Sequence, residues 1–159
     1  MRMPVYNRSR ELRFETVSND NRRWPEANIQ LPKRSTSGAG AYDFFAPASV
    51  IIPPRSQLML WTDVKAQMPP SLVLMLNVRS SMGKHHIRLA NTIGWVDCDY
   101  YSNSSNDGNI GLLLENNSDQ PFCIEEGDRV AQGMFVRFYV TEDDYVATER
   151  TGGFGSTGN

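Results

Sequence analysis

Turn-forming residues divide this sequence into short apolar and β-branched runs, and that pattern restricts the fold more than any other feature. The runs are residues 12–17, 50–52, 58–64, 72–78, 87–93, 110–114 and 130–140. Pro53-Pro54, Pro69-Pro70, Asn106-Asp107-Gly108 and Gly127-Asp128 stand where strands would have to end. No long segment keeps an apolar stripe at helical spacing, so we expect an all-β sandwich or barrel such as a jelly roll. A helical turn is expected only near residues 81–85.

The chain has 159 residues, of which 40% are hydrophobic and 21% charged, so it is expected to form one domain with its own core. Residues 1–150 are predicted to form this β domain, with residues 18–38 as a polar surface loop. Residues 151–159 contain four glycines. Because glycine loses much backbone entropy when it is fixed in a strand, we predict a flexible C-terminal arm that acts as a lid.

Composition and charge argue against several classes of protein. A net charge of −2 gives no general attraction to nucleic acid, so no nucleic-acid partner is expected. No apolar run is long enough to span a membrane, and the first fifteen residues lack the apolar segment of a secretory signal. We therefore expect a cytoplasmic protein. Cys98 and Cys123 are expected to be reduced thiols, because they belong to no CxxC pair or Cys/His cluster.

Two central segments carry residue types suited to binding a nucleotide. Arg79-Ser80-Ser81 follows an apolar run, where a guanidinium and two hydroxyls could hold a phosphate. Alternatively, Arg79 could be salt-bridged, with Ser80 capping a helix. Residues 91–100 contain Gly94 followed by acids. A hairpin here could offer backbone groups to a planar base, or it could be a polar turn with Tyr100 in the core.

Other polar candidates lie outside these segments. Asp43 stands among apolar neighbours at a predicted strand start, where it could cap a turn or orient water on a cation. Residues 153–158 match G-x-G-x-x-G, but no helix follows them, so a dinucleotide fold is not indicated. A Gly-rich strip with two hydroxyls could still wrap phosphate oxygens, or it could be a disordered tail. Adjacent His85 and His86 receive no catalytic role, and Trp95 is expected to be a packing residue.

Taken together and in this order, these segments resemble the five motifs of the trimeric dUTPase family. The motifs correspond to residues 40–46, 79–81, 91–100, 127–132 and 150–158. The resemblance runs from about Leu31 to Gly158, and five motifs in register are more specific than any one of them. It implies a jelly-roll subunit and a homotrimer with active sites at subunit interfaces. It also implies that the arm of one subunit closes a neighbour's site.

The resemblance implies hydrolysis of dUTP to dUMP and pyrophosphate, with Mg²⁺ as the cofactor. Asp97 would orient the water that attacks the α-phosphorus, and Gln132 would help to hold that water or the α-phosphate. Tyr100 would lie under the deoxyribose and exclude a 2′-hydroxyl, while Asp43 would contact the Mg²⁺ shell through water. Uracil would be bound by Asn91, by the backbone around Gly94 and Val96, and by stacking of Phe154. The implied phosphate ligands are Arg79, Ser80, Ser81, Arg150, Gly155, Ser156 and Thr157.

The sequence departs from the family pattern at three places. Val78 replaces the usual proline before Arg79, and Ser81 replaces a common glycine. Gly108 comes eight residues after Tyr100, where the family reaches its glycine in two, so residues 101–108 form an extra loop of unassigned role. Arg150 precedes Phe154 by four residues where five is usual, with Glu149 in the expected position.

Two alternatives accompany this interpretation. A dCTP deaminase shares the fold and an Arg-Ser-Ser motif but needs a catalytic glutamate. The corresponding position here is Leu113, and Glu115 lies two residues further on. A dUTPase-like binding or regulatory protein without activity is the second alternative. The presence of Asp97 and Tyr100 together with Gln132 favours the enzyme.

Overall fold

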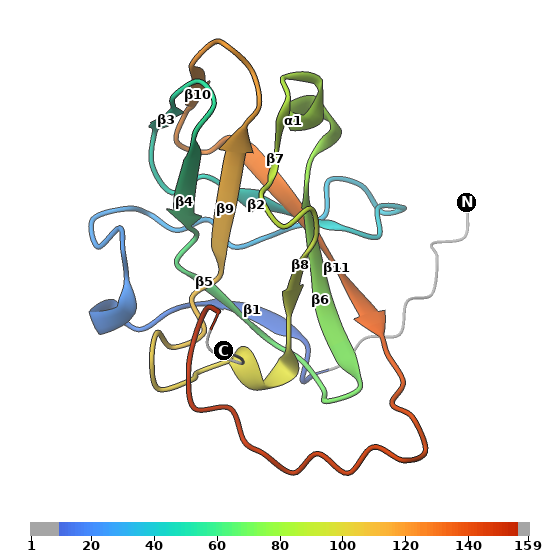
Figure 1. Ribbon diagram of the computed structural model, residues 1–159. Helices are drawn as coiled ribbons and strands as arrows, with labels where there is room; N and C mark the ends of the chain where they lie inside the picture. Colours follow the sequence, from blue (N-terminus) through green and yellow to red (C-terminus); the bar gives the residue numbers. More distant parts are fainter. Residues whose placement is uncertain (1–9, 156–159) are drawn as a thin grey trace.

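A computed structural model describes residues 10–155, and nearly all of its regular structure is β-strand (Figure 1). The strands are β1 Arg13–Thr16, β2 Tyr42–Phe45, β3 Val50–Ile52, β4 Gln57–Trp61, β5 Val64–Gln67, β6 Leu72–Val78, β7 Ile87–Leu89, β8 Gly94–Val96, β9 Gly111–Asn116, β10 Phe122–Ile124 and β11 Arg129–Arg137. The helical elements are α1 Ser80–Lys84 and the 3-10 turns η1 Asn19–Asn21 and η2 Cys98–Tyr100. The expected all-β class is confirmed, and α1 is the helical turn predicted near residues 81–85.

The strands pair into two larger sheets and two short two-stranded sheets whose strands are distant in sequence. One sheet has the order β2-β11-β6-β8 and the other β4-β9-β7, while β1 pairs with β5 and β10 with β3. All of these pairings are antiparallel. β11 lies between β2 and β6, and its register places Gln132 opposite both Asp43 and Asn77. β8 is an edge strand, so within residues 10–155 one side of its backbone pairs with no other strand.

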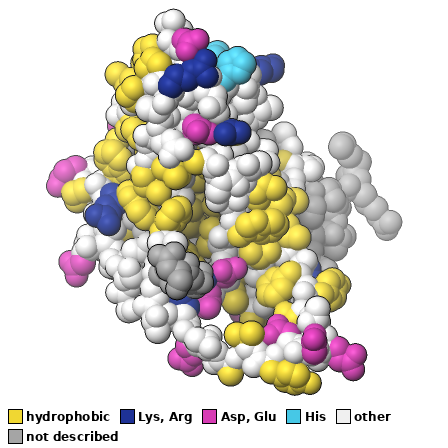
Figure 2. Space-filling view, in the orientation of Figure 1, with side chains coloured by type: hydrophobic (Ala, Val, Ile, Leu, Met, Phe, Trp, Pro, Cys, Tyr) yellow, Lys and Arg dark blue, Asp and Glu magenta, His cyan; other side chains and the backbone are white. Residues whose placement is uncertain are grey.

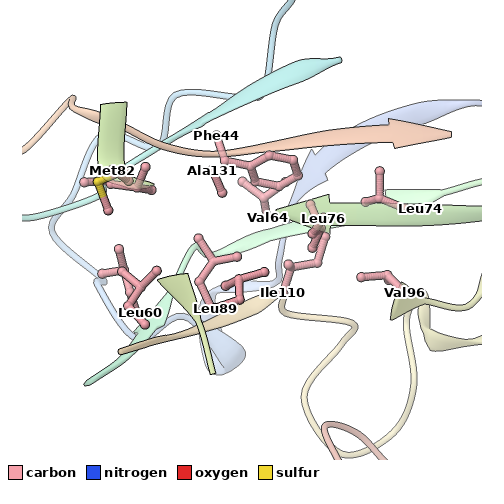
Figure 3. Packing of buried hydrophobic residues seen from close by; sticks show 14 of the residues in the cluster. Phe44, Leu60, Val64, Leu74, Leu76, Met82, Leu89, Val96, Ile110 and Ala131 are labelled. Carbon is pink, nitrogen blue, oxygen red and sulfur yellow. The ribbon is translucent and has the colours of Figure 1, made fainter. Parts of the chain in front are cut away.

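The hydrophobic core lies between the two larger sheets (Figure 3). Phe44 and Leu76 extend from the four-stranded sheet, and Leu60 and Leu89 from the three-stranded one, each with at most 2% of its surface exposed. Fully burying a side chain of this size contributes about 1.5–3 kcal/mol to folding. In β9 buried and half-buried residues alternate, as a strand with one face on the core requires. This core holds β6, β8 and β9 in fixed positions.

Two of the predicted strands are interrupted in the structure. Residues 58–64 were expected to form one strand, but β4 ends at Trp61 and β5 begins at Val64. Between them Asp63 has a left-handed backbone with φ of 56°, and its buried carboxylate accepts the backbone N–H groups of Arg23 and Trp24. The prediction of one strand over residues 87–93 is likewise wrong, because β7 ends at Leu89.

Other strand boundaries also differ from the sequence-based expectation. β11 ends at Arg137 and not at residue 140, because the next residues have no partner strand among the described ones and are exposed, Tyr139 by 87%. The three-residue β10 was not anticipated, since so short a run has no readable alternation. Residues 18–38 contain only η1 and an isolated bridge between Lys33 and Asp43.

The segment after β11 runs around the lower edge of the molecule as far as η2 (Figure 1). Hydrophobic and acidic side chains project along this edge in Figure 2. Tyr145 and Val146 are more than four-fifths exposed there. No helix in residues 10–155 is long and apolar enough to cross a membrane.

Candidate active site

A cavity of about 270 Å³ opens beside the edge strand β8, and we call it the β8 cavity. It brings together many of the residues that the sequence pointed to, from β8, the turn before it, η2 and the arm. Its lining residues are Leu76, Leu89, Asn91, Gly94, Trp95, Val96, Asp97, Tyr100, Ile110, Gly111, Leu112, Leu113, Arg150, Gly153, Phe154 and Gly155. Ser156 and Thr157 lie outside the described residues.

Tyr100 forms a fixed part of the wall of the β8 cavity and is only 7% exposed. Its hydroxyl donates to the carbonyl oxygen of Asn109 at 2.6 Å and accepts from the Nδ2 of Asn106 at 2.8 Å. Burial raises the pKa of Tyr100, and the hydrogen bond from Asn106 and the charge of Arg150 only partly oppose that rise. The ring is therefore uncharged near neutral pH and held at its far end.

Arg150 connects the arm to the acids that follow β8. Its Nη2 donates to Asp97 Oδ2 at 2.7 Å and its Nε donates to Asp99 Oδ1 at 2.8 Å. The guanidinium also lies 5.7 Å from the centre of the Tyr100 ring. Burial alone would lower the pKa of Arg150, but the hydrogen bond to Asp99 and the charges of both acids together raise it. The Arg150 side chain is 9% exposed, whereas that of Asp97 is 57% exposed at the rim of the cavity.

Residues 153–155 of the arm line the β8 cavity of their own chain. The Phe154 ring contacts Trp61 edge-to-face with centroids 5.9 Å apart, and half of its surface remains exposed. Gly153 and Gly155 complete this side of the cavity. Closure of a neighbour's cavity by the arm stays a prediction.

Three further predicted residues, Arg79, Ser80 and Ser81, line a second cavity of about 390 Å³ next to α1, whereas Asp43 and Gln132 are not part of its lining. This α1 cavity is lined by Arg79, Ser80, Ser81, Met82, His85, Phe122, Ile124, Asp128, Arg129 and Val130. Asp43 contacts two of the lining residues: it is 6% exposed, and its Oδ2 lies 3.2 Å from Arg79 Nη1 and 3.6 Å from Arg129 Nη1. Gln132 stands opposite Asp43 across the β2–β11 pair. The two cavities share no lining residue, so this chain brings the predicted residues together in two groups.

Two features of the β8 cavity were not predicted from the sequence. Trp95 is 58% exposed and lines the cavity, so the expectation that it is a packing residue is wrong for this chain. Successive side chains of a strand point to opposite faces of the sheet, and Val96 occupies the face of β8 that packs on the core, so Trp95 points away from that core. Asn106 contacts the Tyr100 hydroxyl from the extra loop. The departure from family spacing marked that loop as unusual, but nothing in the sequence indicated which of its residues would reach Tyr100.

The position of a deaminase glutamate is occupied by an apolar side chain. Leu113 lines the β8 cavity, whereas Glu115 is absent from its lining. The Glu115 carboxylate accepts a hydrogen bond from Arg88 Nε at 2.6 Å, and this bond is the main reason that its pKa is lowered. Glu115 is therefore paired on the outer surface of the three-stranded sheet.

The dUTPase family model matches residues 27–158 of this sequence. The chain belongs to the dUTPase family. The sequence is 39% identical over 148 residues to the deoxyuridine 5′-triphosphate nucleotidohydrolase of Lactococcus lactis, covering 91% of this chain and 96% of that protein. It is 36% identical over 138 residues to the rice enzyme of the same name (Oryza sativa), covering 82% of this chain and 75% of that one.

Solved dUTPase structures share the fold. The crystal structure of dUTPase from Streptococcus mutans has a TM-score of 0.71 and 35% identity, covering 81% of this chain and 98% of that one. The dUTPase from phage phi11 of Staphylococcus aureus has a TM-score of 0.68 at 21% identity, covering 86% and 96%. The fold of this chain is therefore the one that these dUTPase structures share.

Proposed function

We propose that this chain hydrolyses dUTP to dUMP and pyrophosphate in the cytoplasm, by attack of water at the α-phosphorus. The observation that carries this proposal is the convergence of the exposed Asp97 carboxylate, the buried Tyr100 ring and the arm's Phe154 on one cavity. This activity would limit the incorporation of uracil into DNA and would supply dUMP for dTMP synthesis.

The edge strand β8 offers its backbone to the base. Because no strand of the described chain covers its outer side, N–H and C=O groups around Gly94 and Val96 are free to pair with uracil. The amide of Asn91, in the preceding turn, supplies a further donor and acceptor. Cytosine presents a donor where uracil has its O4 acceptor, and thymine adds a methyl group that a tight hairpin excludes. Phe154 would stack on the base when the arm closes.

Tyr100 would contact the sugar, and Asp97 would act at the reacting phosphate. The Tyr100 ring, whose hydroxyl is held by two hydrogen bonds, would lie under the deoxyribose and leave no room for a 2′-hydroxyl. Asp97 would accept a proton from the water whose oxygen forms a bond to the α-phosphorus. The bond from that phosphorus to pyrophosphate breaks as the new one forms, and Gln132 would help to hold the water or the α-phosphate. Arg150 would turn from Asp97 to the outer phosphates, which leaves the carboxylate free.

The phosphate side would be the α1 cavity. Arg79, Ser80 and Ser81 line it, so a guanidinium and two hydroxyls can donate to phosphate oxygens. Nη1 of Arg79 is buried and ion-paired with Asp43 at 3.2 Å, whereas the Arg79 side chain as a whole is 24% exposed. The other N–H groups of the guanidinium would therefore be the donors to a phosphate.

The carboxylates near the α1 cavity fit a magnesium ion that is bound to the substrate's phosphates when it enters the site. Within residues 10–155 no three His, Cys, Asp or Glu side chains gather as a metal cage. Asp43 is shared between two guanidinium groups, so its carboxylate suits a metal-bound water better than the metal itself. Mg²⁺ commonly keeps several waters and is held by one or two carboxylates with the substrate phosphates. When bound, it would neutralise part of the charge of about −4 on the triphosphate.

The separation of the two cavities supports a homotrimer. A nucleotide needs the base groups of the β8 cavity and the phosphate donors of the α1 cavity, and one chain holds these apart. A closed ring of subunits can place the α1 cavity of one chain beside the β8 cavity of the next. The exposed apolar side chains Trp95, Met134 and Phe138 would be covered in such a ring. Full activity of a monomer in light scattering at micromolar concentration would contradict the trimer.

The central experiment measures pyrophosphate release from dUTP, dCTP, dTTP and UTP with Mg²⁺, and again after addition of EDTA. We expect turnover of dUTP alone, lost on chelation. Ammonia release from dCTP would indicate a deaminase. Tight binding of dUTP without any turnover would indicate a regulatory member of the family.

A further inference from the structure

We propose that Asn106, in the extra loop 101–108, is a positioning residue that holds Tyr100 in place for the rejection of ribonucleotides and supports the closed arm. The inference deepens the function proposed above and rests on it. Loop 101–108 is the part of the chain that departs most from the family's spacing.

The loop 101–108 is anchored at both ends. Asn103 Nδ2 donates to the carbonyl oxygen of Tyr100 and to Asn106 Oδ1, each at 2.8 Å. Gly108 has φ of +83°, and a Cβ there would lie 2.8 Å from the Tyr100 carbonyl oxygen, so this close return requires glycine. Asp107 forms an ion pair with Lys65 at 2.9 Å, with both side chains at most 15% exposed. A loop fixed in this way can hold a side chain in one position.

Asn106 supplies one of the two hydrogen bonds that hold the Tyr100 hydroxyl. Its Nδ2 donates to that hydroxyl at 2.8 Å, and the hydroxyl donates to the Asn109 carbonyl oxygen. Asn109 is itself 1% exposed and makes two hydrogen bonds with the buried Asp63. The acceptor of the Tyr100 hydroxyl, Asn109, therefore belongs to the core. The donor to that hydroxyl, Asn106, belongs to the loop. Without Asn106 the Tyr100 hydroxyl would keep a single hydrogen bond, the one to Asn109, and the ring would be held otherwise only by packing.

Asn106 also lies under the arm. A Cβ built on Gly153 would lie 3.1 Å from both Cγ and Nδ2 of Asn106, so the arm's backbone approaches this side chain closely. Gly153 directly precedes Phe154, which lines the same cavity. One amide side chain thus contacts the residue proposed to exclude the 2′-hydroxyl and the segment proposed to close over the base.

The test compares binding of dUMP and UMP, followed by tryptophan fluorescence, in Asn106→Ala and Asn106→Asp variants. Asn106→Asp keeps an oxygen acceptor for Asn103 and Gly108 but removes the donor to Tyr100. In both variants we expect the ratio of the UMP and dUMP dissociation constants to fall by about fivefold, the effect of one ordinary hydrogen bond. Ser104→Ala, at an exposed position in the same loop, should leave the ratio unchanged.

The same Asn106 substitution made in a Tyr100→Phe variant decides whether Asn106 acts through the Tyr100 hydroxyl. In Tyr100→Phe the ring remains but the hydroxyl is absent, so adding Asn106→Ala should change the ratio no further. An unchanged ratio in the Asn106 variants, or an equal fall in the Tyr100→Phe background, would overturn the proposal. If Asn106→Ala does not fold, Asn106→Asp carries the same test. If the chain binds dUMP in preference to UMP but does not hydrolyse dUTP, the proposed function is wrong and the positioning role of Asn106 still stands.

Discussion

The guanidinium of Arg150 donates to the carboxylate of Asp97 at 2.7 Å, although the two residues are 53 positions apart. This ion pair joins the arm to the segment after β8. It also engages the Asp97 carboxylate, which we propose orients the attacking water. A triphosphate carries about four negative charges and would compete for the guanidinium. On the proposed function, closure of the arm over the substrate and release of Asp97 would be a single event.

Asp97→Asn is expected to keep nucleotide binding and to lose most turnover. The neutral amide can still hydrogen-bond to water and to Arg150, but it cannot accept the proton of the attacking water. Loss of a general base typically costs about 10²- to 10⁴-fold in rate. Pyrophosphate release and dUMP binding measure the two effects separately. Asp99→Asn is the matched control, because Asp99 also binds Arg150 but has no proposed contact with the water. Near-normal hydrolysis of dUTP by Asp97→Asn would refute the role of Asp97 as the base.

Arg150→Ala is expected to lower kcat/KM for dUTP by at least about tenfold, or about 1.4 kcal/mol of barrier. The substitution removes a proposed phosphate ligand and the tie between the arm and η2. Arg150→Lys should recover only part of the loss, because an ammonium cannot form the two directed hydrogen bonds that reach Asp97 and Asp99. Steady-state kinetics of both variants check this. Unchanged kinetics with a lowered melting temperature would make Arg150 purely structural.

Deleting residues 151–159 is expected to leave the unliganded melting temperature unchanged. The deletion removes the contact between Phe154 and Trp61, but Phe154 is half exposed and therefore buries little surface. Turnover should fall by at least about tenfold, since the lid no longer excludes water or completes the site. Thermal unfolding and pyrophosphate release on the truncated chain test both parts. A large fall in melting temperature, or normal turnover, would each contradict the lid.

The ion pair between Lys65 and Asp107 should make stability depend on pH. Burial alone would raise the pKa of Asp107, but the Ser18 N–H and the Lys65 ammonium outweigh it and lower that pKa below its ordinary value of 3.8. A carboxyl whose pKa is lowered on folding contributes stability above its unfolded pKa and loses it as the pH falls through the folded pKa. Asp107→Asn should therefore reduce the free energy of unfolding by about 2 kcal/mol at neutral pH.

The same difference between wild type and Asp107→Asn should begin to shrink below pH 3.8, where the carboxyl of the unfolded chain takes up a proton. It should be lost once the pH passes the lower pKa of Asp107 in the folded chain. Urea unfolding across the acid range measures it. Asp119→Asn serves as the control, because its pair with Arg55 is largely exposed and should add nothing measurable. A difference that persists unchanged in acid would show that the charge of Asp107 is not what stabilises the loop.

The all-β class could be predicted from the sequence because strand alternation and turn residues are local properties. The motif residues could be named for the same reason, since each motif is a short contiguous segment. The break at Asp63 was different. Its carboxylate is buried by Arg23, Trp24 and Asn109, all distant in sequence, and no local pattern indicates such partners.

Only the tertiary structure decided which of the motif residues share a cavity. Asn91 to Tyr100 and the arm surround one cavity and Arg79 to Ser81 the other, because β8 lies at the sheet edge while α1 follows the opposite end of β6. The pairing of Arg150 with Asp97 likewise depends on the path of the chain after β11. Side-chain contacts of this kind form between segments that the core brings together, so they depend on packing over the whole domain and not on residue spacing.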